Sequence, residues 1–152
     1  MISLIVLVGI PGCGKSTYAK TLENENTVVL SSDLLRKEIL KDEQSQANNS
    51  LIFETLYARA RENIKNGKNV VVDATNVVKE DRAKLLENFA DLDISRKAIV
   101  VQTPIEICIE RDKNRDRTVG EDVIFRMVES FELPSKEEGF DEIIFIDDGC
   151  LV

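Results

Sequence analysis

Histidine is missing from this 152-residue sequence. Its absence excludes acid–base catalysis by an imidazole and metal sites that use histidine ligands. Cysteine is scarce: the three residues, Cys13, Cys108 and Cys150, have no metal-ligand spacing, and three cannot all pair with one another. The cysteines therefore indicate neither a metal site nor a disulfide framework.

Long apolar runs and excess positive charge are also absent. No hydrophobic stretch approaches the roughly 20 residues that span a bilayer, and the start lacks the basic region and cleavage site of a secretion signal. We therefore expect a cytoplasmic protein with no membrane segment. A net charge of −8 argues against a protein that coats long stretches of nucleic acid, but it leaves recognition of a single nucleic-acid end open.

What the sequence does contain is a regular alternation of short β-branched runs and segments with helical spacing of apolar residues. The expected strands cover 2–8, 27–30, 69–73, 98–102 and 142–146. Helices are expected at 15–22, from the cap candidates 31–33 to about 40, from 50 to 66, and at 79–90, 104–113 and 119–131, with a polar loop at 42–49. Because the strands are apolar on both faces, the pattern predicts a parallel sheet of about five strands flanked by helices on both faces. We expect one α/β domain over residues 1–152.

A glycine-rich loop follows the first expected strand. It reads Gly9-Ile-Pro-Gly-Cys-Gly14-Lys15-Ser16 and fits the phosphate-binding pattern G-x-x-x-x-G-K-[S/T]. In such a loop the backbone N–H groups and the next helix N-terminus hold phosphates, the lysine bridges the β- and γ-phosphates, and the serine hydroxyl binds Mg²⁺. We therefore expect ATP or another nucleoside triphosphate, with Mg²⁺, as ligands. The predicted nucleotide-binding residues are Gly9, Pro11, Gly12, Cys13, Gly14, Lys15, Ser16 and Thr17.

Asp73 ends the apolar run 70–72, so in a parallel sheet it would lie at the carboxyl edge, beside the phosphates. A carboxylate there can hold a metal-bound water, which makes Asp73 a candidate metal residue together with Ser16. The alternative is an aspartate that caps the next turn.

Ser31-Ser32-Asp33-Leu-Leu-Arg36 follows the second expected strand. Asp33 could accept the proton of an attacking hydroxyl, and the planar fork of Arg36 could hold a phosphate or carboxylate of an acceptor. Spacing alone favours a helix cap and a solvated arginine.

A third polar segment, Glu110-Arg111-Asp-Lys-Asn-Arg115-Asp-Arg117, carries arginines after a short helix. Arginines brought over a transferring phosphoryl group stabilise its charge, so the segment has the character of a lid. Its acidic residues fit a solvated mixed-charge surface equally well.

The order of these motifs resembles the polynucleotide 5′-kinase family, including the kinase domains of bacteriophage polynucleotide kinase and of bacterial end-healing enzymes. The resemblance covers residues 2–146. It depends most on the combination of Asp33-x-x-Arg36 with Asp73-Ala-Thr-Asn76. One departure is that only residue 116 separates Arg115 from Arg117, whereas the bacterial relatives have two residues between these arginines.

The resemblance implies a P-loop kinase that transfers the γ-phosphate of ATP to the 5′-OH end of DNA or RNA. It implies these roles: Asp33 as general base; Lys15, Arg111 and Arg115 in catalysis; Arg36 on the 3′-phosphate of the acceptor; and Asp73 and Asn76 as organisers of the site beside metal and acceptor.

Two other interpretations stay open, because related kinases act on sugars, antibiotics, nucleotide-sugars or charged tRNA. The first is a kinase for a small-molecule acceptor, and the second is a non-catalytic nucleotide-binding module. No aromatic residue indicates a base-stacking surface: Tyr18, Phe53 and Tyr57 are as readily core residues.

Overall fold

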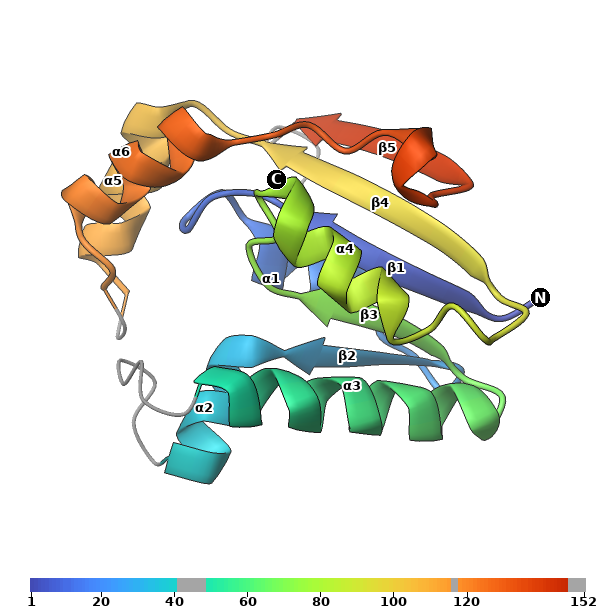
Figure 1. Ribbon diagram of the computed structural model, residues 1–152. Helices are drawn as coiled ribbons and strands as arrows, with labels where there is room; N and C mark the ends of the chain where they lie inside the picture. The colour runs from blue at the N-terminus through green and yellow to red at the C-terminus, as the bar shows by residue number, and fades with distance from the viewer. Residues whose placement is uncertain (41–48, 116–117, 148–152) are drawn as a thin grey trace.

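Five strands form one parallel sheet in the order β2-β3-β1-β4-β5 (Figure 1). The computed structural model describes residues 1–40, 49–115 and 118–147. No helix in these ranges has the length and apolar character needed to cross a membrane. The strands are β1 (Ser3–Val8), β2 (Thr27–Ser31), β3 (Asn69–Asp73), β4 (Ser95–Gln102) and β5 (Glu142–Asp147).

Helices connect the strands and cover both faces of the sheet. They are α1 (Lys15–Leu22), α2 (Ser32–Leu40), α3 (Asn49–Lys65), α4 (Lys79–Glu87), α5 (Ile105–Lys113) and α6 (Glu121–Ser130), followed by a 3₁₀ turn, η1 (Lys136–Glu138). This arrangement confirms the predicted α/β fold class. Figure 1 shows α5 and α6 beyond the edge where the parallel strands end.

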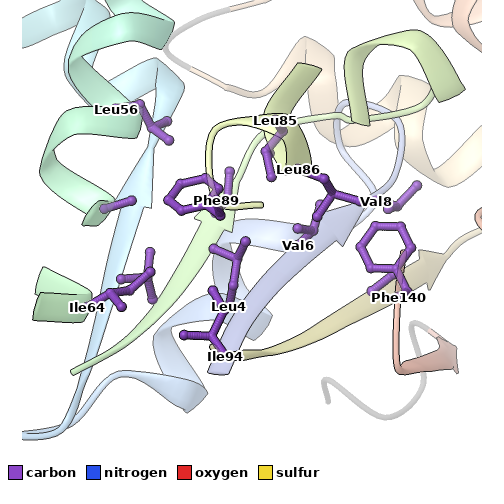
Figure 2. Packing of buried hydrophobic residues seen from close by; sticks show 14 of the residues in the cluster. Leu4, Val6, Val8, Leu56, Ile64, Leu85, Leu86, Phe89, Ile94 and Phe140 are labelled. Carbon is purple, nitrogen blue, oxygen red and sulfur yellow. The ribbon is translucent and has the colours of Figure 1, made fainter. Parts of the chain in front are cut away.

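The core follows from the alternation of side chains along the strands. Leu4 and Val6 of β1 point to one face, where they pack in a cluster with Leu56 of α3 and Leu85 of α4 (Figure 2). Leu7 points to the opposite face and belongs to a second cluster that includes residues of α1. Because β1 is buried on both faces, it has little freedom to shift, and the loop that follows it is held firmly.

The fourth strand begins earlier than the sequence predicted, at Ser95 rather than at 98. The added residues include two charged ones: Arg96 pairs with Leu4 and Lys97 with Ile5 of β1. The Arg96 guanidinium donates to backbone carbonyls in the loop before the strand, which satisfies its charge without exposing the strand. The turn η1 was not predicted.

Three predictions concern positions outside the described residues. They are the polar loop predicted at 42–49, Arg117 and Cys150. Of the predicted loop only Asn49 is described, and it begins α3.

Gly12 brings the loop after β1 into close contact with α5. Its φ is +81°, and a Cβ added there would lie 2.4 Å from the backbone oxygen of Cys108. Only a residue without a side chain can therefore hold the loop against this helix.

Glycine 67 provides a matched comparison, since its φ is also +81° and an added Cβ would meet nothing within 4 Å. We expect Gly67→Ala to lower the free energy of unfolding by about 1 kcal/mol, because of the left-handed backbone alone. Gly12→Ala should cost about 2–4 kcal/mol, because the clash adds to the strain. Urea denaturation of both variants measures the difference, and equal losses would contradict the close contact.

A buried ion pair joins α4 to η1. Arg82 Nε donates to Glu138 Oε1 at 2.8 Å, and the two side chains are 0% and 3% exposed. Arg82 Nη1 also donates to the backbone oxygen of Asn76 at 2.8 Å, in the loop after β3. Burial by itself would raise the pKa of Glu138, but hydrogen bonds from Arg82 and from the Ser135 backbone hold that pKa below its usual value.

We expect Arg82→Met to lower the free energy of unfolding by about 3–5 kcal/mol at pH 7, because it leaves the Glu138 carboxylate buried without its partner. Without Arg82, burial raises the pKa of this carboxyl above its ordinary value of 4.5, so the deficit should begin to shrink above pH 4.5 and continue to shrink below it, since protonation removes the charge. Chemical denaturation at several pH values measures both effects. Arg59→Met, which breaks an exposed pair with Glu38, is the control and should change stability little.

Candidate functional site

The carboxyl ends of β1, β2 and β3 bring three separate segments of the sequence to one edge of the sheet. Gly9, directly after β1, donates its backbone N–H to the Thr75 oxygen, after β3, at 2.9 Å. Asn76 donates its side-chain amide to the Leu7 oxygen at 2.9 Å and to the Ala74 oxygen at 3.3 Å. These bonds fix the loop after β1 relative to the loop after β3.

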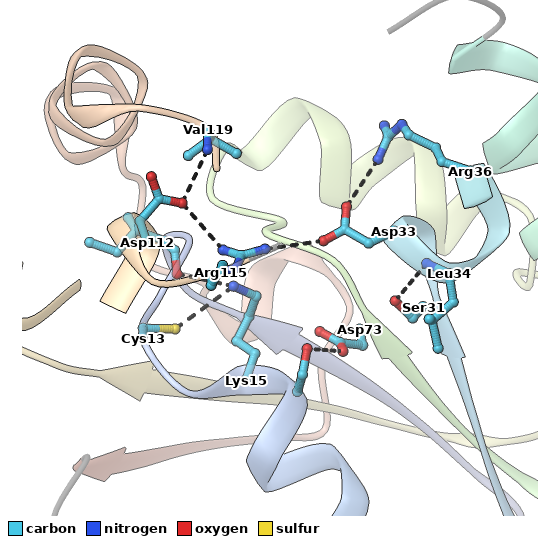
Figure 3. A network of polar contacts seen from close by, with 12 residues as sticks. Cys13, Lys15, Ser31, Asp33, Leu34, Arg36, Asp73, Asp112, Arg115 and Val119 are labelled. Atoms are coloured by element: carbon cyan, nitrogen blue, oxygen red, sulfur yellow. Dashed lines mark hydrogen bonds and ion pairs between the residues drawn. The ribbon is translucent and has the colours of Figure 1, made fainter. Parts of the chain in front are cut away.

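The phosphate loop, residues 9–16, leads into α1 as the motif requires. Gly12 and Gly14 both have positive φ. The Lys15 side chain is buried, and its Nζ donates to the Ile10 oxygen at 3.0 Å and lies 3.8 Å from Cys13 Sγ (Figure 3). The Thr103 hydroxyl donates to the Cys13 oxygen at 2.7 Å, which ties the loop to the end of β4. The lysine ammonium is therefore held against the loop by Ile10 and Cys13. Loops of this type bind phosphate through their backbone N–H groups.

Ser16 and Asp73 meet beside this loop. The Ser16 hydroxyl donates to Asp73 Oδ2 at 2.8 Å, and Asp73 is 6% exposed. Burial raises the pKa of Asp73, although the charge of Lys15 and the hydrogen bond from Ser16 oppose the rise. The pair thus presents a hydroxyl and a buried carboxylate at one point.

Ser16 and Asp73 could together contribute to an Mg²⁺ site. The described residues contain no group of three or more acidic, cysteine or histidine side chains able to hold a metal. Mg²⁺ commonly keeps several waters and takes one or two protein oxygens together with phosphate oxygens of a substrate. A hydroxyl and one carboxylate beside a phosphate loop match that donor set.

Asp33 and Arg36 lie on the other side of the same cavity. Ser31 Oγ accepts the Leu34 N–H at 3.3 Å and so serves the start of α2, while the Asp33 carboxylate points toward two arginines (Figure 3). Arg36 Nη1 lies 3.4 Å from Asp33 Oδ1, and Arg36 Nη2 donates to Asn49 Oδ1. Arg36 is only 7% exposed, so the solvated arginine that spacing alone favoured is wrong.

Two arginines reach the site from the end of α5: Arg111 lies in its last turn, and Arg115 follows the C-cap residue Asn114. Arg115 Nη2 lies 3.5 Å from Asp33 Oδ2, and Arg111 Nη1 donates to the Gly12 oxygen at 3.4 Å. The end of α5 therefore faces the phosphate loop, and Arg115 beyond it faces the Asp33 carboxylate.

One large cavity, of about 880 Å³, connects these groups. Its lining includes the predicted residues Pro11, Gly12, Gly14, Lys15, Ser16, Thr17, Asp33, Arg36, Asp73, Arg111 and Arg115. Gly9, Cys13 and Asn76 are not among the lining residues. Cys13 is fully buried. The Asn76 amide is bonded to backbone carbonyls, and Asn76 lines a second cavity between α3 and α4.

Sequence reasoning missed the apolar part of this cavity, which is lined by Phe53, Val119, Val123 and Met127. Val123 and Met127 share one face of α6, and the sequence does not indicate what covers that face. Phe53 was equally assignable to the core, and it lies under the Arg36 guanidinium at 6.0 Å. The signal was present as helical spacing, but spacing alone does not separate a core face from a cavity face.

Two curated relatives are similar to this chain over almost its whole length. L-seryl-tRNA(Sec) kinase of Methanococcus maripaludis is 29% identical over 150 residues, which cover 91% of this chain and 56% of that protein. The bifunctional polynucleotide phosphatase/kinase of Schizosaccharomyces pombe is 26% identical over 153 residues, covering 97% of this chain and 34% of that protein. The chain thus spans about half, or less, of the length of these relatives.

Solved structures resemble the whole fold. A putative kinase from Chloroflexus aurantiacus superposes with a TM-score of 0.77 at 16% identity, covering 96% of this chain and 88% of that one. APS kinase CysC of Mycobacterium tuberculosis, solved with AMPPNP and APS, gives 0.66 at 24% identity, covering 99% and 93%. A chain of the Pnkp1/Rnl/Hen1 RNA repair complex gives 0.69 at 25% identity, covering 85% and 43%.

A family model described as "AAA domain" matches residues 4–134, which include the phosphate loop, Asp33, Asp73 and the arginines Arg111 and Arg115. Both relatives described above are named as kinases or as containing one, and so are the structural neighbours from Chloroflexus aurantiacus and Mycobacterium tuberculosis. This chain therefore belongs to the AAA domain family and has the fold of the P-loop kinases.

Proposed function

We propose that this chain transfers the γ-phosphate of ATP to a hydroxyl group, and that the hydroxyl is the 5′ end of DNA or RNA. One observation carries the proposal. The Asp33 carboxylate lies between Arg36 and Arg115, in the same cavity as Lys15 and Ser16. A carboxylate there can accept a proton from a hydroxyl while the arginines hold the charged groups around it.

The nucleotide half of the cavity would hold the triphosphate. The backbone N–H groups of the phosphate loop and Lys15 would bind its oxygens, and Arg111 and Arg115 would neutralise charge on the transferring group. Ser16, with Asp73 behind it, would hold Mg²⁺, which when bound supplies charge neutralisation at the phosphate oxygens. The structural neighbour solved with AMPPNP supports a nucleotide of this type.

The acceptor half would orient the hydroxyl. Asp33 would take its proton in line with the γ-phosphate, and the buried Arg36 would bind a phosphate one linkage away from that hydroxyl. In a nucleic-acid end, that group is the 3′-phosphate of the terminal nucleotide. The likeness to the polynucleotide phosphatase/kinase and to the RNA repair complex supports this acceptor.

A second acceptor is favoured by a separate observation. The 29% identity to L-seryl-tRNA(Sec) kinase supports a serine hydroxyl carried on a tRNA. Both acceptors present a hydroxyl near phosphodiesters, so the same residues would serve. They differ in whether an aminoacylated or a 5′-hydroxyl end is phosphorylated.

The test is transfer from γ-³²P-labelled ATP with Mg²⁺ to a 5′-hydroxyl oligonucleotide. Seryl-tRNA, adenosine 5′-phosphosulfate and a sugar pool serve as alternative acceptors. We expect Asp33→Asn to reduce the turnover number by about 10²–10⁴-fold, because the general base is lost. ATP affinity, measured by calorimetry, should stay within a few-fold of the wild-type value. Asp93→Asn, at an exposed position in the turn before β4, is the matched control and should leave transfer unchanged.

Label on seryl-tRNA alone, or on a small acceptor alone, would replace the nucleic-acid end with that acceptor. ATP binding without transfer to any acceptor would indicate a non-catalytic module. Full activity of the Asp33→Asn protein would remove this carboxylate from the reaction.

A second prediction concerns Asp73. Because burial raises its pKa, the ionised carboxylate costs folding free energy above that pKa, and the cost vanishes as the pH falls. We expect Asp73→Asn to raise the midpoint of thermal unfolding at pH 7 without nucleotide, with a difference that narrows toward pH 4. The same variant should bind Mg²⁺·ATP about 10–100-fold more weakly, while affinity for ATP in EDTA changes little. An unchanged Mg²⁺·ATP affinity would contradict the metal assignment.

A further inference from the structure

Asp112 is a buried carboxylate in the last turn of α5, 2% exposed. Its two oxygens accept two consecutive backbone N–H groups from the segment that precedes α6. Oδ1 accepts the Val119 N–H at 3.1 Å, and Oδ2 accepts the Gly120 N–H at 3.0 Å. A carboxylate held by two backbone donors has a closely defined position and orientation.

The same carboxylate also faces Arg115. Arg115 Nη1 lies 3.6 Å from Asp112 Oδ1, and its other terminal nitrogen lies 3.5 Å from Asp33 Oδ2. Figure 3 shows the resulting chain of contacts, from the Val119 N–H through Asp112 and Arg115 to Asp33. Arg115 thus lies between two carboxylates: the buried Asp112 and Asp33, which is proposed as the base.

Asp112 further determines where α6 begins. Gly120 is the N-cap residue of α6, with φ of 96°, and it has no side chain able to cap the helix. The negative charge of Asp112, bonded to the Gly120 N–H, lies at the positive end of the helix dipole. Val123 and Met127 of this helix line the cavity that contains Asp33 and Arg36.

We infer that Asp112 is a positioning residue for phosphoryl transfer. It determines the position of the Arg115 guanidinium and the position of the α6 face that lines the cavity, and it does not itself contact substrate. An amide in its place has no charge and only one acceptor oxygen, so it cannot accept both backbone N–H groups and also attract the guanidinium. The segment before α6 and Arg115 then lose part of what positions them. This inference rests on the proposed function, because it assigns Arg115 to the phosphates of ATP.

The experiment is a double-mutant cycle between Asp112→Asn and Arg115→Gln. Mg²⁺·ATP affinity is measured by calorimetry and turnover by label transfer to the best acceptor. We expect each single variant to weaken Mg²⁺·ATP binding by about 10-fold. The affinity of the double variant should lie within about 2-fold of the affinity of Arg115→Gln alone. Turnover should show the same pattern, with losses of about 10–100-fold in each single variant.

Asp122→Asn is the matched control, because it makes the same substitution at an exposed position in the first turn of α6. It should change neither affinity nor turnover. Circular dichroism confirms that each variant is folded at the assay temperature. If Asp112→Asn does not fold, Asp112→Glu takes its place in the cycle, since it keeps the charge but displaces the carboxylate by one methylene.

If the loss of Mg²⁺·ATP affinity in the double variant equals the product of the losses in the two single variants, Asp112 does not act through Arg115. That result would overturn the inference. So would an Asp112→Asn protein with wild-type affinity and turnover. A chain that binds Mg²⁺·ATP but transfers to no acceptor would overturn the proposed function alone, since the affinity cycle still decides the role of Asp112. A wild-type chain that does not bind ATP would overturn both.

Discussion

The parallel pairing of β1 with β3 is the constraint on which the candidate site depends. It places Asp73 beside the loop that follows β1, where Ser16 reaches it at 2.8 Å. A slip of one residue in this register would turn Asp73 to the other face of the sheet, since side chains alternate along a strand. Hydrogen bonds from Gly9 to Thr75 and from Asn76 to Leu7 hold the register where the strands end.

The charge of the cavity lining differs in sign from the net charge of the whole chain. The protein carries a net charge of −8, yet the residues lining the cavity include four cationic side chains and two carboxylates. The cations are Lys15, Arg36, Arg111 and Arg115, and the carboxylates are Asp33 and Asp73. A cavity lined in this way concentrates positive potential where phosphates would bind, and the acidic remainder disfavours extended contact with a nucleic-acid backbone.

Buried charges recur around this edge of the sheet. Asp73, Asp112 and the pair of Arg82 with Glu138 are all almost fully enclosed, and each is bonded to a loop that borders the site. Such groups are costly to bury unless every partner is in place, so they hold loops in one arrangement. The apolar clusters stabilise the sheet, whereas these polar contacts determine the positions of the loops at its edge.

The sequence by itself determined the fold class, the phosphate loop and most of the strands, because each depends on local patterns: β-branched runs, glycine spacing and helical periodicity. It made Asp73 a candidate through its place at the end of a strand, whereas Asp33, Arg36 and Arg115 were favoured only through the order of motifs. The extent of the domain over residues 1–152 stays a prediction. The start of β4 was misjudged because charged residues in a buried strand obscure the pattern.

Only the tertiary structure decided which side chains meet. It showed that Arg36 is buried against Phe53, that Val123 and Met127 line the cavity, and that Asp112 anchors the segment before α6. These contacts join residues whose burial depends on elements far away in the sequence. Local spacing gives the face of a helix on which a residue lies, but what covers that face is determined by how distant segments pack.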